Sequence, residues 1–323
     1  MTAAPDVARD QQRIAVCICT YHRPAGLAAL LAALDRQRLG GLSDDGIEIV
    51  VVDNSVAGDA SATWRAVGRT LRFAIRFTHE PRKGLAFARN AALAEALKPG
   101  ITHIAFVDDD ELPSPDWLRS LVDTLERRGT DAAIGPVLPV FETPPPFWLP
   151  VMAFGDLRSH DQGLVDDGYT CNAIISRSAI DAMSLLFDAR FNDTGGEDTM
   201  FFQRLQEGGG RIAWAEGAVV FAPIPKHRMR AQWLWRRWYR TGDIEASLGR
   251  YDPASAMGRL HNLMRGLARL SVGSLRVAKA ALWDSWRKPG AFVASFYTLC
   301  RGAGLVASVA GARYKEYAAP GYR

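Results

Sequence analysis

Four consecutive carboxylates, Asp108-Asp109-Asp110-Glu111, directly follow the apolar run at residues 104–107. The run contains an aromatic residue and two β-branched residues, which predicts a buried strand that ends at the acidic cluster. Half-buried carboxylates need a counter-charge, because an unpaired buried anion is costly. Oxygen ligands of this kind suit Mg²⁺ or Mn²⁺, which commonly bridge one or two carboxylates to the phosphates of a substrate. The cluster therefore predicts a metal and diphosphate site.

A plainer interpretation of the same stretch is a solvated acidic turn. Ser114 and Asp116 stand just before Trp117 and could cap the helix expected there. The cluster alone leaves these two interpretations open.

The elements that would position the cluster alternate between strands and helices. Strands are expected at residues 13–20, 47–52, 73–77 and 101–107, with helices from Pro24 onward, at 59–70 and at 84–97. This alternation predicts parallel strands joined by right-handed crossovers. In such sheets ligands gather beyond the carboxyl ends of the strands. Those ends are followed here by Thr20-Tyr21, Asp53-Asn54 and Asp108-Asp109-Asp110, so three strands deliver polar groups to one crevice.

Several segments in the same order resemble the inverting family 2 glycosyltransferases of GT-A fold. The matching segments are residues 19–23, 51–55, 84–90, 106–110 and 115–118, and the resemblance covers about residues 13–225. It implies an α/β, Rossmann-like GT-A domain with a mostly parallel sheet. It also implies a nucleotide-sugar donor, usually a UDP-sugar, and a divalent metal, Mn²⁺ or Mg²⁺.

The resemblance implies a role for each matching residue. Asp53 would hold the uracil or the ribose, and Asp108 and Asp110 would be the DxD pair that binds the metal. The remaining nucleotide-binding positions would be Thr20, Tyr21, Arg23, Arg89, Asn90 and Asp109. For Arg89 and Asn90 the alternative is an ordinary exposed helix face.

The Glu197-Asp198 pair follows two glycines and opens an expected helix that ends near Gly208. Carboxylates at a helix start are favoured by the helix dipole, so capping alone could explain them. Transfer to a hydroxyl with inversion needs one general base near the attacking oxygen. The pair matches the ED motif of the family, which implies that Asp198 is the base and that Glu197 binds or orients the acceptor.

Arginine and tryptophan are dense in residues 226–240, but no known DNA or RNA module surrounds them, so nucleic acid is not expected as a partner. In the family context His227 would be a third metal ligand and Arg228 would offset diphosphate charge. Gln232 is two residues too early for the QxxRW pattern of processive synthases. Residues 226–323 are similar to the succinoglycan-type exopolysaccharide glycosyltransferases, which add one sugar to a polyprenyl-linked oligosaccharide.

Two further stretches lie between these motifs. Residues 132–138 and 170–175 read as strands, and Cys171 stands where the family often has a small residue. Residues 139–150 contain five prolines and three aromatic residues, which predicts a shaped loop. We expect a lid or acceptor loop there, and the alternative is simple packing of the aromatic side chains.

Length and composition set the frame for these motifs. The chain has 323 residues, 48% of them hydrophobic, and a net charge of +4, which is compatible with a large core and an appended region. Its four cysteines show no CxxC spacing, which fits a reducing compartment. Because residues 1–13 carry no apolar core of a signal peptide, we expect a cytosolic protein. The expected division is a polar tail at 1–12, a GT-A domain at 13–225 and a helical, basic region at 226–323.

The helical region is expected to dock on the inner leaflet of the membrane without crossing it. At 100° per residue, Arg265, Arg269, Arg276 and Lys279 fall within one arc, opposite Leu260, Leu263, Leu267 and Leu270. A basic stripe opposite an apolar one suits anionic headgroups. The stretch from Pro289 to Ala312 is apolar but is divided by Arg301, which disfavours a spanning helix. The alternative is packing onto the catalytic domain or a second subunit.

Together these patterns predict a metal-dependent inverting glycosyltransferase that builds a cell-surface glycan at the cytosolic face of the membrane. The donor would be a UDP-sugar and the acceptor a glycan or a polyprenyl-linked oligosaccharide. Two alternatives stay open at this point. One is a metal-dependent phosphoryl-transfer or hydrolytic enzyme, and the other is a non-catalytic protein that binds sugar nucleotides or glycans.

Overall fold

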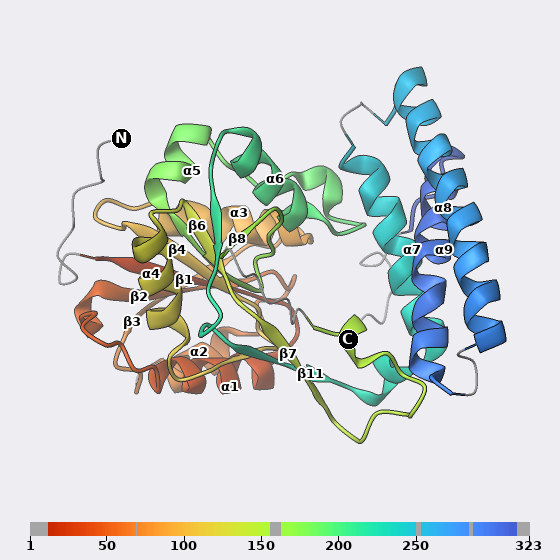
Figure 1. The fold of residues 1–323 in the computed structure, drawn as a ribbon. Coiled ribbons are helices and arrows are strands. Elements are labelled where there is room, and N and C mark those ends of the chain that lie inside the picture. Colours follow the sequence, from red (N-terminus) through yellow and green to blue (C-terminus); the bar gives the residue numbers. More distant parts are fainter. Residues whose placement is uncertain (1–11, 69, 156–162, 250–252, 284–286, 315–323) are drawn as a thin grey trace.

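The computed structural model describes residues 12–68, 70–155, 163–249, 253–283 and 287–314. All but the last residue of the predicted polar tail lies outside this part. The N-terminal two thirds of the chain form an α/β domain, and three long helices lie beside it (Figure 1).

The first four strands are parallel and alternate with helices, as the sequence predicts. They are β1 (Ile14–Thr20), β2 (Ile47–Asp53), β3 (Ala74–His79) and β4 (His103–Val107), joined through α1 (Pro24–Asp35), α2 (Ser61–Val67) and α3 (Leu85–Ala96). Thr20 and Asp53 are paired at the last register position of β1 and β2. The carboxyl ends of these strands therefore meet at one edge, which is where the predicted crevice requires them.

The second half of the sheet is mixed. Its order is β3-β2-β1-β4-β9-β6-β10-β8, with β6 (Ala132–Ile134), β8 (Leu164–Val165), β9 (Asn172–Ser176) and β10 (Ile212–Trp214). Strand β9 runs antiparallel between β4 and β6, and β8 is antiparallel to β10. The sheet is thus mostly parallel, in agreement with the predicted fold class.

The expectation of one continuous strand at residues 132–138 is wrong. The chain leaves the large sheet after β6 and enters a small sheet of order β5-β11-β7, formed by β5 (Leu112–Pro113), β7 (Val137–Phe141) and β11 (Val220–Ile224). Pro136 lacks an amide hydrogen, and Gly135 lies so close to the Ala218 carbonyl that an added Cβ would sit 2.3 Å from that oxygen. The chain changes sheets at this pair.

The predicted loop at 139–150 is correct only in its second part. Pro139 lies inside β7, where it is tolerated because β7 is the edge strand of the small sheet, next to β11. Two of the three aromatic residues, Phe141 and Trp148, pack into an apolar cluster with α7 (Ala231–Ser247), and Phe147 is 85% exposed. The packing alternative holds for two of these side chains.

Helices cover both faces of the large sheet (Figure 1). On one face α1 and α4 (Trp117–Arg128) contribute the fully buried Leu30 and Trp117. On the other face α3 and α6 (Glu197–Glu207) contribute Leu93 and Phe201, and α5 (Arg177–Met183) lies beside them. Burial on both faces explains why the strands are continuous apolar runs.

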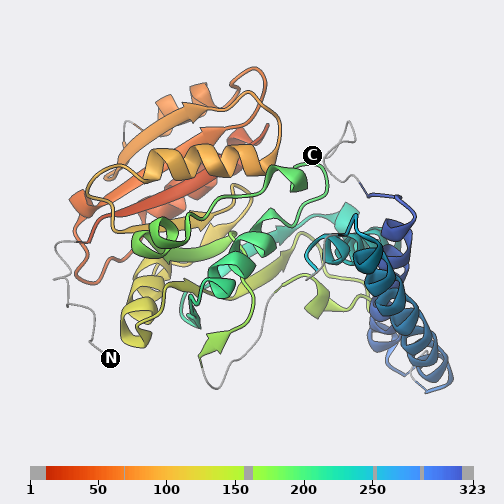
Figure 2. The same cartoon turned by 90° about the horizontal axis from the view of Figure 1, so that it is seen from above.

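The C-terminal helices are α7 (Ala231–Ser247), α8 (Ala256–Trp283) and α9 (Pro289–Val309). They form a separate layer with α7 nearest the catalytic domain and α8 farthest from it (Figure 2). The chain reaches α7 from β11 through one short turn, η5 (Lys226–Met229). The layer is therefore attached next to the carboxyl edge of the sheet.

The predicted orientation of the basic stripe on α8 is wrong. Arg265 and Arg269 both form ion pairs with Glu245 on α7, and Arg276 donates a hydrogen bond to Thr298 on α9. Arg301 of α9 joins the same Glu245 at 2.6 Å. The arginines face the neighbouring helices because their acidic partner lies there, and the apolar side of α8 faces outward.

Helix α9 is long and apolar enough to cross a membrane by length and composition alone. In this structure it packs against both α7 and α8. Its central Arg301 is held by Glu245. The expected non-spanning arrangement stays a prediction.

Candidate active site

The acidic cluster after β4 is held by the turn that follows β1. Thr20 Oγ1 donates a hydrogen bond to Asp109 Oδ2 at 2.7 Å, and Arg23 Nη1 lies 2.9 Å from Asp109 Oδ1. Arg23 also pairs with Asp110 at 2.8 Å. Burial raises the pKa of Asp109 to about 6, against the opposing effects of Arg23 and Thr20. The contacts of Asp109 therefore fix the backbone that carries Asp108 and Asp110.

The capping interpretation of this stretch is not what the structure shows. The side chain of Asp116, at the N-cap of α4, makes no capping hydrogen bond. It instead pairs with Arg38 at 3.0 Å and with Arg119 at 3.2 Å.

Arg89 connects the two acidic motifs. Its guanidinium forms a buried ion pair with Glu197, and its Nη2 lies 3.4 Å from Asp108 Oδ1. The residue is only 3% exposed, so the interpretation of Arg89 as part of an exposed helix face is wrong. Burial, Asp198 and Asp108 raise the pKa of Glu197, whereas Arg89 opposes the shift. The first turn of α6 is thereby fixed against the end of β4.

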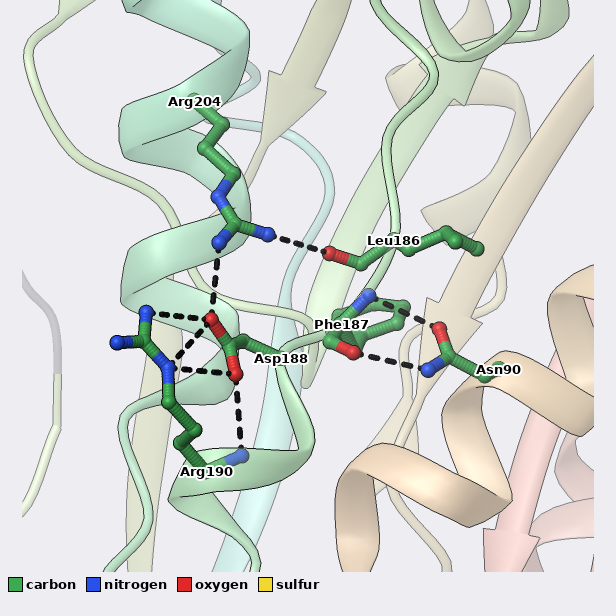
Figure 3. Close-up of polar contacts among 6 residues, drawn as sticks. All are labelled: Asn90, Leu186, Phe187, Asp188, Arg190 and Arg204. Atoms are coloured by element: carbon green, nitrogen blue, oxygen red, sulfur yellow. Dashed lines mark hydrogen bonds and ion pairs between the residues drawn. The ribbon is translucent and has the colours of Figure 1, made fainter.

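The segment 186–190 is joined to α3 at Asn90, the residue after Arg89 (Figure 3). The Asn90 side chain donates to the Phe187 carbonyl at 2.8 Å and accepts from the Phe187 amide at 2.9 Å. The Phe187 ring lies 5.8 Å from the Arg89 guanidinium carbon. Asn90 thus joins α3 to this segment, and its predicted nucleotide contact stays a prediction.

Asp188 anchors the same segment to α6 (Figure 3). It pairs with Arg190 at 2.8 Å and with Arg204 at 2.9 Å, and Arg204 also donates to the Leu186 carbonyl. The hydrogen bond from Arg190 lowers the pKa of Asp188 to about 2.

Asp198 stands beside Glu197 at the start of α6 and is partly exposed, unlike its neighbour. Its Oδ1 accepts hydrogen bonds from the amide of Thr199 at 2.7 Å and from the Thr199 hydroxyl at 3.3 Å. The preceding Gly196 has φ +99°, and an added Cβ there would lie 2.4 Å from Ile244 Cγ2 of α7. Only glycine allows α6 to start so close to α7. Asp198 can face a ligand while Glu197 stays buried.

Asp53, at the end of β2, holds the backbone of the segment that follows this strand. Asp53 is fully buried, and its oxygens accept from the amides of Ser55 and Ala60. Tyr21 lies 5.8 Å from the ammonium of Lys83, which follows β3. Lys83 belongs to none of the motifs, although its place after a parallel strand could have indicated it. Base or ribose contacts of Asp53 and Tyr21 stay predictions.

Arg228 reaches the acidic cluster from η5, with its Nη2 3.9 Å from Asp110 Oδ2. His227 is exposed on the same turn. Within the described residues no three His, Cys, Asp or Glu side chains come close enough together to hold a metal. A metal contact of His227 therefore stays a prediction.

Glu111 is a buried carboxylate to which the sequence analysis assigned no individual role. One of its oxygens has no hydrogen-bond partner. Burial and the charges of Asp108 and Asp110 raise its pKa well above the ordinary value, whereas a hydrogen bond with Cys171 opposes the shift. Cys171 thus lies against the acidic cluster, beside the predicted donor site.

Asp108 and Asp110 fit a divalent cation by the chemistry of the donor set. Both offer hard oxygen ligands, and burial together with Asp110 and Asp198 raises the pKa of Asp108, so further positive charge there is favourable. Mg²⁺ needs only one or two protein carboxylates when substrate phosphates complete its shell. The two aspartates and a diphosphate would satisfy that requirement without a third side chain.

Residues 15–183, more than half of the chain, match the family described as Glycosyl transferase family 2. The chain belongs to this family. It is therefore a glycosyltransferase, and the activity expected from the ordered motifs is confirmed at that level. The motifs described above, from Thr20 through Cys171, lie within the matched residues, and Glu197 and Asp198 follow them.

A relative with a curated name supports the same assignment. The glycosyltransferase is 32% identical over 244 residues to the succinoglycan biosynthesis protein ExoM of Rhizobium meliloti (strain 1021). The match covers 73% of this chain and 74% of the relative.

Solved structures share the fold over nearly the whole chain. S. aureus TarS 1–349 in complex with UDP has a TM-score of 0.50 at 14% identity, covering 94% of this chain and 93% of TarS. The mannosyltransferase PcManGT from Pyrobaculum calidifontis, in complex with GDP-Man and Mn²⁺, has a TM-score of 0.53 at 18% identity, covering 97% and 80%. At these identities the likeness concerns the fold, which is the predicted GT-A type.

Proposed function

We propose that this glycosyltransferase moves one sugar from a UDP-sugar to a hydroxyl of a glycan acceptor, with inversion at the anomeric carbon. The observation that carries the proposal is the link from Asp108 through Arg89 to Glu197, which brings the predicted diphosphate site beside the predicted base. The complexes of TarS with UDP and of PcManGT with GDP-Man and Mn²⁺ support a nucleotide-sugar donor and a divalent cation.

In this proposal Asp198 accepts the proton of the attacking hydroxyl. Its partial exposure gives it access to an acceptor, and its hydrogen bonds from Thr199 orient the carboxylate. Glu197, held by Arg89, fixes the acceptor side of the site. Arg228 stands near Asp110 and faces the charge that develops on the leaving diphosphate. A cation bound by Asp108 and Asp110 would neutralise part of that same charge.

The acceptor is proposed to be a lipid-linked oligosaccharide in exopolysaccharide synthesis, handled at the cytosolic face of the membrane. The name of the relative, a succinoglycan biosynthesis protein, supports a polysaccharide pathway. The exposed Phe147, on the loop that follows β7, offers a ring on which a sugar can stack.

A thermal-shift screen of UDP, GDP and their sugars, with Mn²⁺ and with chelator, tests the donor. A ligand at a hundredfold excess over its Kd stabilises the native state by about 2.7 kcal/mol. We expect UDP and a UDP-sugar to raise the Tm only with the metal, and Asp198→Asn to keep that shift while losing transfer. Phosphate release without an acceptor, or donor binding by the unaltered chain without turnover on any glycan acceptor, would contradict the proposal.

A further inference from the structure

The outer side of α8 carries an apolar face along the length of the helix, with the exposed polar residues Ser271 and Lys279 among its members. Its members recur at helical spacing and are each at least 45% exposed: Met257, Leu260, Met264, Leu267, Val272, Leu275, Leu282 and Trp283. At about 1.5 Å per residue, a helix of this length presents the face over roughly 40 Å. We call these eight residues the outer face of α8.

The helix is locked in the orientation that exposes this face. The opposite side holds the buried residues Gly258, Asn262, Gly266, Gly273 and Ala280. A Cβ added at Gly273 would lie 2.6 Å from the Leu299 amide nitrogen of α9. Glu245 further holds Arg265 and Arg269 toward α7. Rotation of α8 to bury its outer face would break these contacts.

Within the part of the chain that the structure describes, the charged side chains of α8 and α9 are all positive. Neither α8 nor α9 contains an aspartate or glutamate, whereas Arg259 and Lys279 are exposed on α8 and Lys288 is exposed at the start of α9. A second copy docked through this face would place cations next to cations, which opposes self-association. Anionic lipid headgroups supply the missing negative charge.

The C-terminal end of α8 exposes two large apolar side chains. Leu282 is 81% exposed and Trp283 is 72% exposed, and Lys288 follows shortly after them. Tryptophan and lysine side chains favour the boundary between headgroups and acyl chains. Exposing a leucine and a tryptophan to water at the end of α8 is unfavourable, whereas a membrane interface would bury both side chains.

We propose that the outer face of α8 inserts into the interfacial layer of an anionic membrane, with the helix axis along the surface. The apolar side chains enter the acyl region, and Arg259, Lys279 and Lys288 lie at the headgroups. This deepens the proposed membrane location by identifying the surface that contacts lipid, and it reverses the expected contact through the arginine stripe. Because α7 follows η5 directly, the active site is then held close to lipid.

Flotation of the full chain with vesicles of phosphatidylcholine and phosphatidylglycerol tests the proposal. We expect the wild-type chain to float, and Leu260→Gln/Met264→Gln/Leu267→Gln to lower the bound fraction at least tenfold. The matched control is Val56→Gln/Leu164→Gln/Leu186→Gln, which changes three exposed apolar residues on the catalytic domain and should float as wild type does. An unchanged Tm and UDP binding in the α8 variant would show that the fold is intact.

Two other outcomes would overturn the proposal. Flotation unaffected by the α8 substitutions would mean that lipid is contacted elsewhere. A lipid-free dimer that the α8 variant converts to monomer, with no flotation of the wild type, would assign the face to a second copy. Asp198→Asn should float as the wild type does, because this residue does not lie on α8. If the unaltered chain floats but transfers no sugar, the proposed function is contradicted and this inference stands.

Discussion

The Arg89 Nη2 lies 3.4 Å from Asp108 Oδ1, which places a buried cation of α3 directly behind the first carboxylate after β4. Arg89→Met removes this cation and leaves Glu197 buried without its partner. Breaking a buried ion pair from one side costs about 3–5 kcal/mol. We expect a loss of that size in the free energy of unfolding, measured with urea.

The control for Arg89 is Arg38→Met, which breaks a pair between Asp116 and an arginine side chain that is 68% exposed. Exposed pairs contribute about 1 kcal/mol or less. An equal loss of unfolding free energy in the two variants would mean that the buried pairs of Arg89 contribute no more to stability than an exposed pair.

Asp198→Asn tests the general base. The substitution keeps size and hydrogen bonding to Thr199 but removes the group that accepts the proton. We expect the transfer rate to fall by about a hundredfold or more while donor affinity is unchanged. Glu207→Gln, at the far end of the same helix, should leave the rate unaltered. Normal turnover by the Asp198 variant would remove this residue from the mechanism.

Asp110→Asn tests the metal site by calorimetric titration with UDP. If Asp108 and Asp110 share a cation with the diphosphate, the variant should bind UDP more weakly only in the presence of Mn²⁺ or Mg²⁺. Because Asp110 also pairs with Arg23, the chelator arm is needed to separate the two roles. An equal loss of affinity in chelator would assign Asp110 to the protein scaffold alone.

Asp188 predicts a specific dependence of stability on pH. Its pKa in the folded protein is about 2, below the ordinary value of 3.8. The folded state therefore binds this proton less readily than the unfolded state, so the stabilisation is present above pH 3.8 and is lost as the pH falls toward 2. Since Arg190 is exposed, we expect Asp188→Asn to cost about 1 kcal/mol at neutral pH. The difference from wild type should shrink as the pH falls through 2 and vanish below it, and a difference that stays constant down to pH 2 would contradict the assignment.

The parallel half of the sheet could be predicted because its signals are local. The apolar runs that became β1 to β4 and the polar residues after them fix both the strands and the edge where ligands gather. The roles of Asn90 and Arg265 could not be predicted in the same way. Their partners, Phe187 and Glu245, lie on segments distant in sequence, and only the packed structure brings them together. The antiparallel position of β9 between β4 and β6 could not be predicted for the same reason.

The change of sheets at Gly135-Pro136 was missed for a different reason. The apolar pattern of residues 132–138 predicts an extended backbone, and both halves of the segment are indeed strands. It does not report which sheet each half joins. That choice depends on Ala218 and β11, some eighty residues later in the chain.

The place of β9 between β4 and β6 has a consequence during synthesis. Among the described strands, β6 lies between β9 and β10, and one edge of β4 pairs with β9. The pairings with β9 cannot form until residues 172–176 have been made. The nascent chain therefore leaves the ribosome with an open apolar edge on β4 while more than sixty further residues are added. Open strand edges and non-local pairing slow folding and invite aggregation. We infer that the yield of folded enzyme depends on how quickly translation passes from β4 to β9.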